Sequence, residues 1–337
     1  MSKARGIGVK RIRVNVEAQN QSKEDIGILD EFQRDFVEFW GRLPNKFFFG
    51  ALLLMWLALF QFLGNSTFGY IDTPSLFRWM MGAYTSPSGD DGHGFLVPLV
   101  VLGLFWWKQK ELVALPLKTW WPSLVLVVLG VVLHVFAYVA QFPQVSIVAF
   151  FIGLYGLMGV AWGFRFLRAS FFPFFLFVFC VPLGGQGQVI TMPLRQLVAR
   201  IVTLIAHAGI APDLIREGTQ LTDAAHTFSY DIAPACSGIR SLVTLLALTT
   251  IYGCLSFKPA WKRAVMVVSA FPLAVIGNVV RITFTVAVAE LLGQDAGKKV
   301  EQNFGFVTFA VAIVCVILLG KWLRDPEPEP ASEVKAA

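Results

Sequence analysis

Three short polar groups interrupt apolar stretches in the second half of the chain, and the first carries a candidate nucleophile. It is the run PACSGIRS (234–241), in which Cys236 ends a polar segment and precedes an expected helix. Helix N-terminal amides and the helix dipole stabilise a thiolate, so Cys236 is suited to nucleophilic attack. Ser237 and Gly238 are small enough to let a substrate backbone approach. Arg240, one turn into the helix, either binds substrate or anchors the helix.

The second group is GNVVRI (277–282), inside a run that is otherwise apolar from 265 to 289. Asn278 and Arg281 are three residues apart and therefore share one face of a helix, where Asn278 is a candidate to bind substrate. A guanidinium beside Cys236 would lower the pKa of the thiol and hold a carboxylate or a developing oxyanion. The alternative is that Arg281 is a cation that snorkels to the membrane interface.

The third group is EQNFGFVTF (301–309), where the last apolar run begins. Glu301 is its candidate catalytic residue, and the alternative is an ordinary solvated acid. The remaining cysteines are expected to be inert and buried: Cys180, Cys254 and Cys315. The sequence has no CxxC pair or Cys/His cluster, so we expect neither a metal site nor a disulfide framework, and no cofactor.

The composition places these groups in a membrane protein. Of 337 residues, 56% are hydrophobic and only 15% are charged, with a mean hydropathy of +0.64. Soluble domains carry about 25% charged residues, and a chain of this length cannot enclose so much apolar surface. The net charge of +6 comes from cations in short loops between apolar runs, which indicates membrane topology rather than binding to nucleic acid.

The apolar runs predict an all-α polytopic membrane protein of about eight transmembrane helices, because a crossing helix needs roughly 20 apolar residues. The expected spans are 47–64, 93–107, 120–140, 145–164, 169–184, 238–256, 262–280 and 304–322. Every second loop is basic, which predicts that both termini are cytoplasmic and that the three polar groups lie near the outer face. The pair Lys298–Lys299 is an exception, because it is expected outside.

This topology leaves one long outer segment, 185–236. Within it, 192–210 interleaves apolar residues with polar ones, which predicts an amphipathic helix at the interface. The polar members are Arg195, Gln196, Arg200 and His207. The turn-rich stretch 216–233 is compatible with a small β-hairpin.

The expected domain organisation has three parts. Residues 1–46 form a cytoplasmic leader that is partly disordered, with a short amphipathic helix in its second half. Residues 47–324 form the transmembrane catalytic domain, and 325–337 form a disordered cytoplasmic tail. No internal repeat is visible in the sequence, so an inverted-repeat transporter gains no support.

The combination of ACSGIRS with GNxxRI some 40 residues later resembles the exosortase/archaeosortase family. The stretch HGFLVP (93–98) is similar to that family's SHGxxxP-type stretch, and REG (216–218) lies upstream of the cysteine as in the family. Residues 301–309 have the spacing of its final motif. The resemblance covers about 70–310.

The resemblance implies a cysteine protease or transpeptidase of the inner membrane. In this family, a cysteine cleaves a C-terminal sorting signal of secreted proteins, made of a short motif such as Pro-Glu-Pro, a transmembrane helix and a basic tail. The protein is then passed to a cell-surface acceptor, such as a lipid or a polysaccharide. Carried over by motif, Cys236 is the nucleophile and Arg281 the essential arginine.

The third catalytic position departs from the family, because Glu301 stands where His or Arg is usual. Glu301 acts as a base, or another residue substitutes for it, or activity is lost; the substitutes are Gln302, Asn303 and His226. Two other functions compete with the enzyme, namely a transporter and a non-catalytic scaffold for exopolysaccharide export. These residues leave open the sorting motif, the acceptor, the balance of hydrolysis and transfer, and the oligomeric state.

Overall fold

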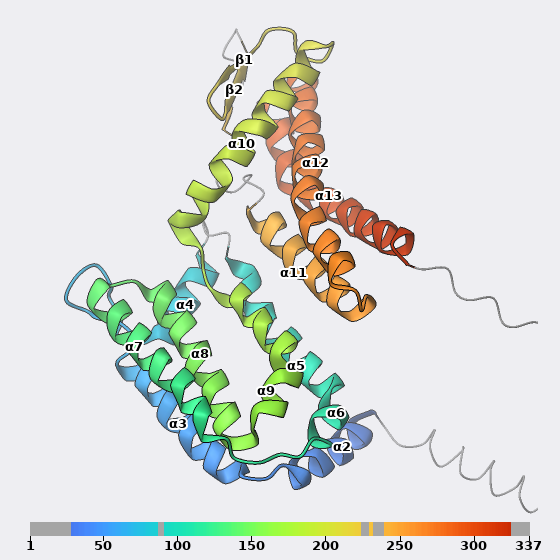
Figure 1. Ribbon diagram of the computed structural model, residues 1–337. Coiled ribbons are helices and arrows are strands. Elements are labelled where there is room, and N and C mark those ends of the chain that lie inside the picture. Colours follow the sequence, from blue (N-terminus) through green and yellow to red (C-terminus); the bar gives the residue numbers. More distant parts are fainter. Residues whose placement is uncertain (1–27, 87–90, 224–228, 232–238, 325–337) are drawn as a thin grey trace, which may run out of the picture.

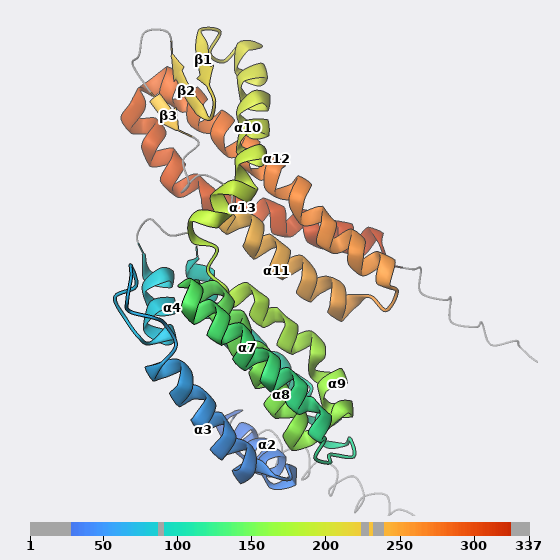
Figure 2. The same cartoon turned by 60° about the vertical axis from the view of Figure 1, so that its left-hand side comes forward.

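The computed structural model describes residues 28–86, 91–223, 229–231 and 239–324. Helices make up an N-terminal bundle (28–180) and a C-terminal part (184–324), which also carries a small sheet (Figures 1 and 2). The bundle comprises α2 (Ile28–Arg42), α3 (Lys46–Phe62), α4 (Leu76–Thr85), η1 (Gly92–Phe95), α5 (Leu96–Trp107), α6 (Gln109–Val113), η2 (Trp121–Ser123), α7 (Leu124–Ala140), α8 (Pro143–Trp162), α9 (Phe164–Phe175) and η3 (Leu176–Cys180). The C-terminal part comprises α10 (Gly184–His207), β1 (Leu214–Glu217), β2 (Gln220–Asp223), β3 (Ser229–Asp231), α11 (Ile239–Ser256), α12 (Ala260–Leu292) and α13 (Gln294–Trp322).

Helix α8 lies at the centre of the N-terminal bundle because its glycines let neighbouring helices approach closely. A Cβ on Gly153 would lie 2.0 Å from the ring of Trp56 in α3, and one on Gly156 would lie 2.9 Å from Val127 in α7. In a membrane, the hydrophobic effect does not drive helices together, because lipid tails are as apolar as the side chains. Close van der Waals packing drives helix association instead. Two-thirds of α8 (67%) is accordingly buried within the protein.

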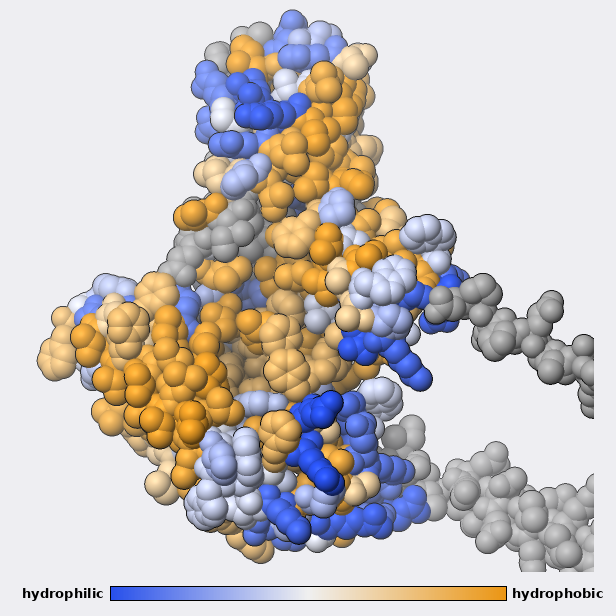
Figure 3. Space-filling view, in the orientation of Figure 1, coloured by the Kyte–Doolittle hydropathy of each residue, from blue (hydrophilic) through white to orange (hydrophobic). Residues whose placement is uncertain are grey.

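The all-α membrane architecture is confirmed, whereas the count of eight spans stays a prediction. Among the described residues, three helical segments are long and apolar enough to cross a bilayer: 121–140, 143–162 and 260–292. A fourth is present if α2 and α3, which meet at 96°, form one broken span. The apolar helices at 92–107, 242–256 and 309–322 are shorter. Hydrophobic side chains cover the flanks of the bundle, and hydrophilic ones gather at its lower end (Figure 3).

Tryptophans mark one end of the helices, which we call the tryptophan end. Eight of the ten tryptophans lie at helix starts or ends on this side: Trp40, Trp106, Trp107, Trp120, Trp121, Trp162, Trp261 and Trp322. Indole rings prefer the boundary between hydrocarbon and water. This distribution agrees with the predicted topology, in which the helix ends at 107, 162 and 322 and the helix starts at 121 and 260 lie on one side of the membrane.

Helix α12 is longer than expected and longer than a bilayer crossing requires, so we call its C-terminal part, beyond residue 280, the projecting end. The apolar run predicts a span over 262–280, but the helix continues for 33 residues to Leu292. Its length is about 50 Å at 1.5 Å per residue, against about 30 Å of hydrocarbon. The extension is held by α10 and by the sheet, since Val198, Leu214 and Val286 belong to one buried cluster.

Helix α10 also differs from expectation. A helix was expected over 192–210, but α10 begins earlier, at Gly184, and ends at His207. It rises from the bundle along α12 rather than lying flat at the interface (Figures 1 and 2). The stretch expected as a hairpin holds antiparallel β1 and β2, with Glu217 opposite Gln220, and β3 pairs with β2. Gly218 has a φ of +66° in the β1–β2 turn, a conformation that favours glycine.

Candidate functional site

The start of α11 lies level with Asn278 of α12. The two helices are antiparallel neighbours joined by residues 257–259. Ile239 is 17 residues before Ser256 at the end of α11, and Gly277 is 17 residues after Ala260 at the start of α12. Because both helices rise by the same distance per residue, Ile239 and Gly277 lie at about the same height. Packing agrees with this alignment, because Leu242 and Ala274 belong to the same buried cluster. In the sequence, Cys236 is three residues before Ile239.

Asn278 and Arg281 face the protein interior rather than lipid. Asn278 is 8% exposed and belongs to the buried stripe of α12, which repeats every three or four residues through Ala274 and Ile282. Arg281 is half-buried, and its Nε atom is covered by protein. A snorkelling cation would carry its guanidinium into water, so the geometry favours a site residue over the interfacial reading.

Helix α13 returns along α12 and brings the segment of Glu301 to the same end. The two helices meet at Gly293, whose φ of +86° permits the sharp reversal. The rings of Phe284 and Phe304 stack with centroids 4.5 Å apart, which fixes the register. By the same count, Gly305 is level with Arg281, and Glu301 lies about one turn farther from the tryptophan end.

Arg195 is buried, although the sequence predicts it on the polar side of an amphipathic helix. Its helix was expected to show Arg195 on a polar face, but the side chain is only 4% exposed. The residue starts the buried face of α10, which continues through Val198 and Val202. The spacing of Arg195, Val198 and Val202 at i, i+3 and i+7 indicates that Arg195 belongs to the buried face of the helix. The polar residues Gln196 and Arg200 nearby made this pattern hard to recognise in the sequence.

Arg195 lies on the side of α10 that packs against α12. Its neighbour Leu194 packs on the cluster of Leu242, and Val198 packs on that of Ile282. Within the described part of the chain, Arg195 Nε and Nη2 are buried without a hydrogen-bond partner. A buried guanidinium is costly unless an acceptor meets it, which makes Arg195 a candidate for binding an anionic group.

The turn η1 brings His93 towards the site from the N-terminal bundle. η1 contacts α11, although the two are separated by about 145 residues of sequence. The buried carboxylate of Asp91 accepts hydrogen bonds from the backbone N–H groups of Leu183 at 2.9 Å and Gly184 at 3.2 Å. This carboxylate ties η1 to the start of α10. The sequence reasoning treated His93 only as part of a motif and did not select it as a catalytic candidate.

Tyr84 holds the same turn from the other side. Its hydroxyl donates a hydrogen bond to the carbonyl of Cys180. Gly94 packs against its ring so closely that a Cβ there would lie 2.3 Å from the ring. Burial raises the pKa of Tyr84 above its ordinary value, with smaller contributions from Cys180 and Asp91, so the hydroxyl stays protonated and keeps donating.

Several sequence candidates lie outside the described residues or lack described side chains. Cys236, Ser237, Gly238 and His226 fall outside the described residues. Arg240 lies in the first turn of α11, and 301–303 lie in the first half of α13. The REG stretch is placed differently: Arg216 and Glu217 are exposed on β1, which packs on the projecting end of α12.

The other cysteines and histidines have structural surroundings. Cys180 is buried as expected, whereas Cys254 and Cys315 are partly exposed because their helices have open faces. His134 lies 3.1 Å from both Ser146 Oγ and the carbonyl of Leu63. No group of three or more metal-ligating side chains occurs within the ranges that the structure describes.

Comparison with known proteins identifies a family. Residues 79–318 match the family model of the transmembrane exosortases (Exosortase_EpsH). The match includes η1, Arg195, the start of α11, Asn278, Arg281 and the first half of α13. No curated protein and no solved structure matches the chain.

Proposed function

Because the chain belongs to the transmembrane exosortase family, we propose that it is a membrane-embedded cysteine protease and transpeptidase. It cleaves the C-terminal sorting signal of secreted proteins, of the Pro-Glu-Pro type, and transfers them to a cell-surface acceptor. The observation that carries this proposal is that Asn278 and Arg281 lie at the height where α11 begins, with the buried Arg195 on the adjoining helix α10. Cys236, the only cysteine set in a polar motif, comes three residues before α11 in the sequence.

The chemistry proceeds through a thioester. The thiolate of Cys236 attacks the carbonyl carbon of the scissile peptide, and negative charge develops on the carbonyl oxygen. The C–N bond breaks as the leaving amine takes up a proton, which leaves the acyl group on sulfur. An acceptor nucleophile, or water, then attacks the thioester and releases the thiolate.

Arg281 and Asn278 are suited to stabilise the developing charge. A guanidinium and an amide fixed in a half-buried site need little reorganisation when the oxyanion forms, which makes them more effective than water. Arg281 also favours the thiolate of Cys236 if the two are within about 4–6 Å. Ser237, Gly238 and Arg240 contribute the substrate-binding surface at the start of α11.

Arg195 is suited to bind the acidic residue of the sorting motif. Its buried Nε and Nη2 atoms lack partners among the residues described, and a carboxylate accepts both in the bidentate geometry that guanidinium favours. Substrate binding would then give these two atoms an acceptor that the described residues do not supply.

Glu301 is the proposed third catalytic residue, and His93 is a second candidate. A free glutamate titrates near pH 4.3 and is a poor acid at pH 7, and a nearby Arg281 would hold it ionised. Glu301 would then mainly orient Arg281. The contact between η1 and α11 favours His93 as the proton carrier, because an imidazole ordinarily titrates at about pH 6.5.

The proposed location is the inner membrane, with both termini cytoplasmic and the site at the outer face. The tryptophan end is then cytoplasmic, which agrees with its basic loops. Substrates arrive as secreted proteins held by their own C-terminal helix, so the scissile bond lies at the membrane surface. The projecting part of α12 with α10 and the sheet would form the surface that receives them.

The test is processing of a secreted reporter that ends in the motif, an apolar helix and a basic tail. Cells with the wild-type chain should release the shortened reporter, and Cys236→Ala and Cys236→Ser should not, because the thiolate is both nucleophile and acyl carrier. Cys315→Ala is the matched control and should leave processing intact. Processing by the Cys236 variants at normal protein level would favour the scaffold or transporter reading.

A further inference from the structure

A cavity of about 700 Å³ opens at the end of α11 that is opposite to the candidate site. Its walls come from the end of α5, the α6 region, the first nine residues of α9, the last turn of α11 and the first turn of α12. The cavity therefore lies between the N-terminal bundle and the C-terminal part. The volume is within the range of about 300–1,000 Å³ that small-molecule sites occupy. The proposed peptidase chemistry makes no use of it.

The cavity is lined by four cations and one acid. The cations come from three separate segments of chain and are Lys108, Arg165, Arg168 and Arg263, whereas Glu111 is the acid. Loop cations at this end are expected from membrane topology, but topology does not require them to surround one cavity. The convergence leaves an excess of positive charge, which favours an anionic ligand.

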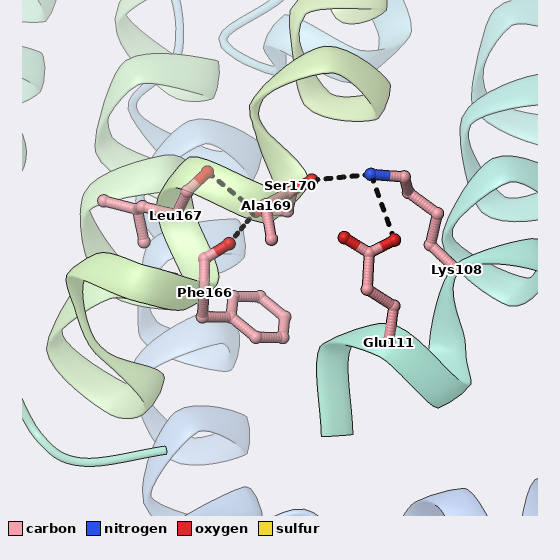
Figure 4. A network of polar contacts seen from close by, with 6 residues as sticks. All are labelled: Lys108, Glu111, Phe166, Leu167, Ala169 and Ser170. Atoms are coloured by element: carbon pink, nitrogen blue, oxygen red, sulfur yellow. Dashed lines mark hydrogen bonds and ion pairs between the residues drawn. The ribbon is translucent and has the colours of Figure 1, made fainter. Parts of the chain in front are cut away.

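Two of the cations are held in place by the backbone. Lys108 Nζ donates to the carbonyl of Ala169 at 3.2 Å and lies 3.5 Å from Glu111 Oε2 (Figure 4). Arg263 Nε donates to the carbonyl of Phe257 at 2.7 Å. The Lys108–Ala169 bond joins two segments far apart in the chain, and the Arg263–Phe257 bond lies within the α11–α12 turn. Both fix where the charges point, which reduces the entropy lost when a ligand binds.

The other two cations are available to a ligand. Arg165 and Arg168 are exposed on the first turns of α9, and neither forms an ion pair within the part of the chain that the structure describes. Guanidinium groups offer a planar fork of donors that fits the oxygens of a phosphate.

The rim of the cavity is apolar and lies at the membrane interface. Trp107 (66% exposed), Phe171 (57%) and Leu255 (45%) present large hydrophobic side chains beside the basic wall. Trp107 belongs to the tryptophan end, so this rim is at the height of lipid headgroups. A ligand that fills both parts has a phosphate head and hydrocarbon tails.

We propose that this cavity binds the headgroup of an anionic phospholipid, with the phosphates on Arg165, Arg168 and Arg263 and the acyl chains along Trp107 and Phe171. The excess of cations and the volume favour a lipid with two phosphates, such as diphosphatidylglycerol. Basic pockets between transmembrane helices bind such lipids. The bound lipid would bridge the bundle and the α11–α12 hairpin.

The experiment measures lipid binding to the full chain purified in detergent, by native mass spectrometry and by the midpoint of thermal unfolding. The probes are diphosphatidylglycerol, phosphatidylglycerol, phosphatidylcholine and inorganic pyrophosphate. Diphosphatidylglycerol should bind most tightly and raise the unfolding midpoint. Phosphatidylcholine should bind weakly, and pyrophosphate should not compete at equal concentration, because it lacks the tails.

The decisive comparison uses two double variants with equal loss of charge. Arg165→Gln with Arg168→Gln should weaken binding of diphosphatidylglycerol by about tenfold or more, since each basic residue contributes a several-fold factor. Lys258→Gln with Lys321→Gln removes two exposed cations outside the cavity and should change binding less than about twofold.

Three results would overturn the proposal. The first is an equal loss of binding in both double variants, and the second is an equal affinity for phosphatidylcholine and diphosphatidylglycerol. The third is competition by pyrophosphate that is as strong as competition by lipid, which would assign the site to a free phosphate. Should the Gln pair unfold, Arg165→Lys with Arg168→Lys keeps the charge and removes the fork. It should bind more weakly than wild type, and unchanged binding would equally refute the proposal.

Discussion

The carboxylate of Asp91 accepts the backbone N–H of Leu183 at 2.9 Å, and so joins the η1 turn to the first turn of α10 across 92 residues of sequence. Asp91 is 5% exposed, and its second oxygen accepts the N–H of Gly184. A charge-assisted bond of this kind is about twice as strong as a neutral one. The contact holds His93 near α11, and with it the N-terminal side of the candidate site.

Asp91→Ala should therefore destabilise the protein and slow processing. The substitution leaves two partly buried backbone donors without their acceptor, at a cost of about 1–2 kcal/mol. A lower midpoint of thermal unfolding in detergent would show this loss of stability. Asp72→Ala, which removes an exposed carboxylate, is the matched control. Equal midpoints for the two variants would mean that the Asp91 contact does not support the fold.

Arg281→Lys should fail nearly as badly as Arg281→Ala in reporter processing, with a loss of about 100-fold or more if the guanidinium stabilises the oxyanion. A lysine keeps the charge but cannot copy the two-pronged geometry. Arg200→Lys on the exposed face of α10 is the control and should process normally. Full activity of Arg281→Lys would show that a positive charge is sufficient at this position and that the guanidinium geometry is not required.

Arg195→Gln should reduce processing by about 10- to 100-fold, because a charge-assisted bond to the substrate carboxylate is lost. A structural role alone predicts the same loss for every reporter. The proposed role predicts that the variant no longer distinguishes a Pro-Glu-Pro reporter from one with Pro-Gln-Pro. Preserved discrimination between these two reporters would remove Arg195 from substrate recognition.

Glu301→Gln should slow processing without abolishing it, and Glu301→His, which restores the family's usual residue, should retain or improve it. Initial rates measured across pH 5–9 test the assignment. If His93 carries the proton, His93→Gln should remove the rise in rate as pH passes through the imidazole range, since only the neutral ring accepts a proton.

A different result would assign the third catalytic role to a residue other than Glu301. An inactive Glu301→His beside a fully active Glu301→Ala would show that this role is elsewhere. A normal pH profile in His93→Gln would then leave His226 as the next candidate to be replaced.

The sequence by itself determined what depends on local composition. Long apolar runs predict where α7, α8 and α12 cross the membrane, because a chain in hydrocarbon must satisfy its backbone within each helix. The pairing of the cysteine motif with GNxxRI was sufficient to indicate the family that the match over 79–318 confirms. The candidate residues follow from those motifs without coordinates.

Only the tertiary structure decided which of these residues meet and which surface they occupy. The sequence predicts a span that ends at 280, yet α12 continues to Leu292, where α10 and the sheet cover it. Arg195 was expected on a polar face with Gln196 and Arg200, but its burial depends on which neighbour packs there, and periodicity alone does not specify that neighbour. The contact of His93's turn with α11, and the convergence of Arg165 and Arg263, join segments far apart in the chain. Such long-range juxtapositions are set by helix packing, and no local pattern encodes them.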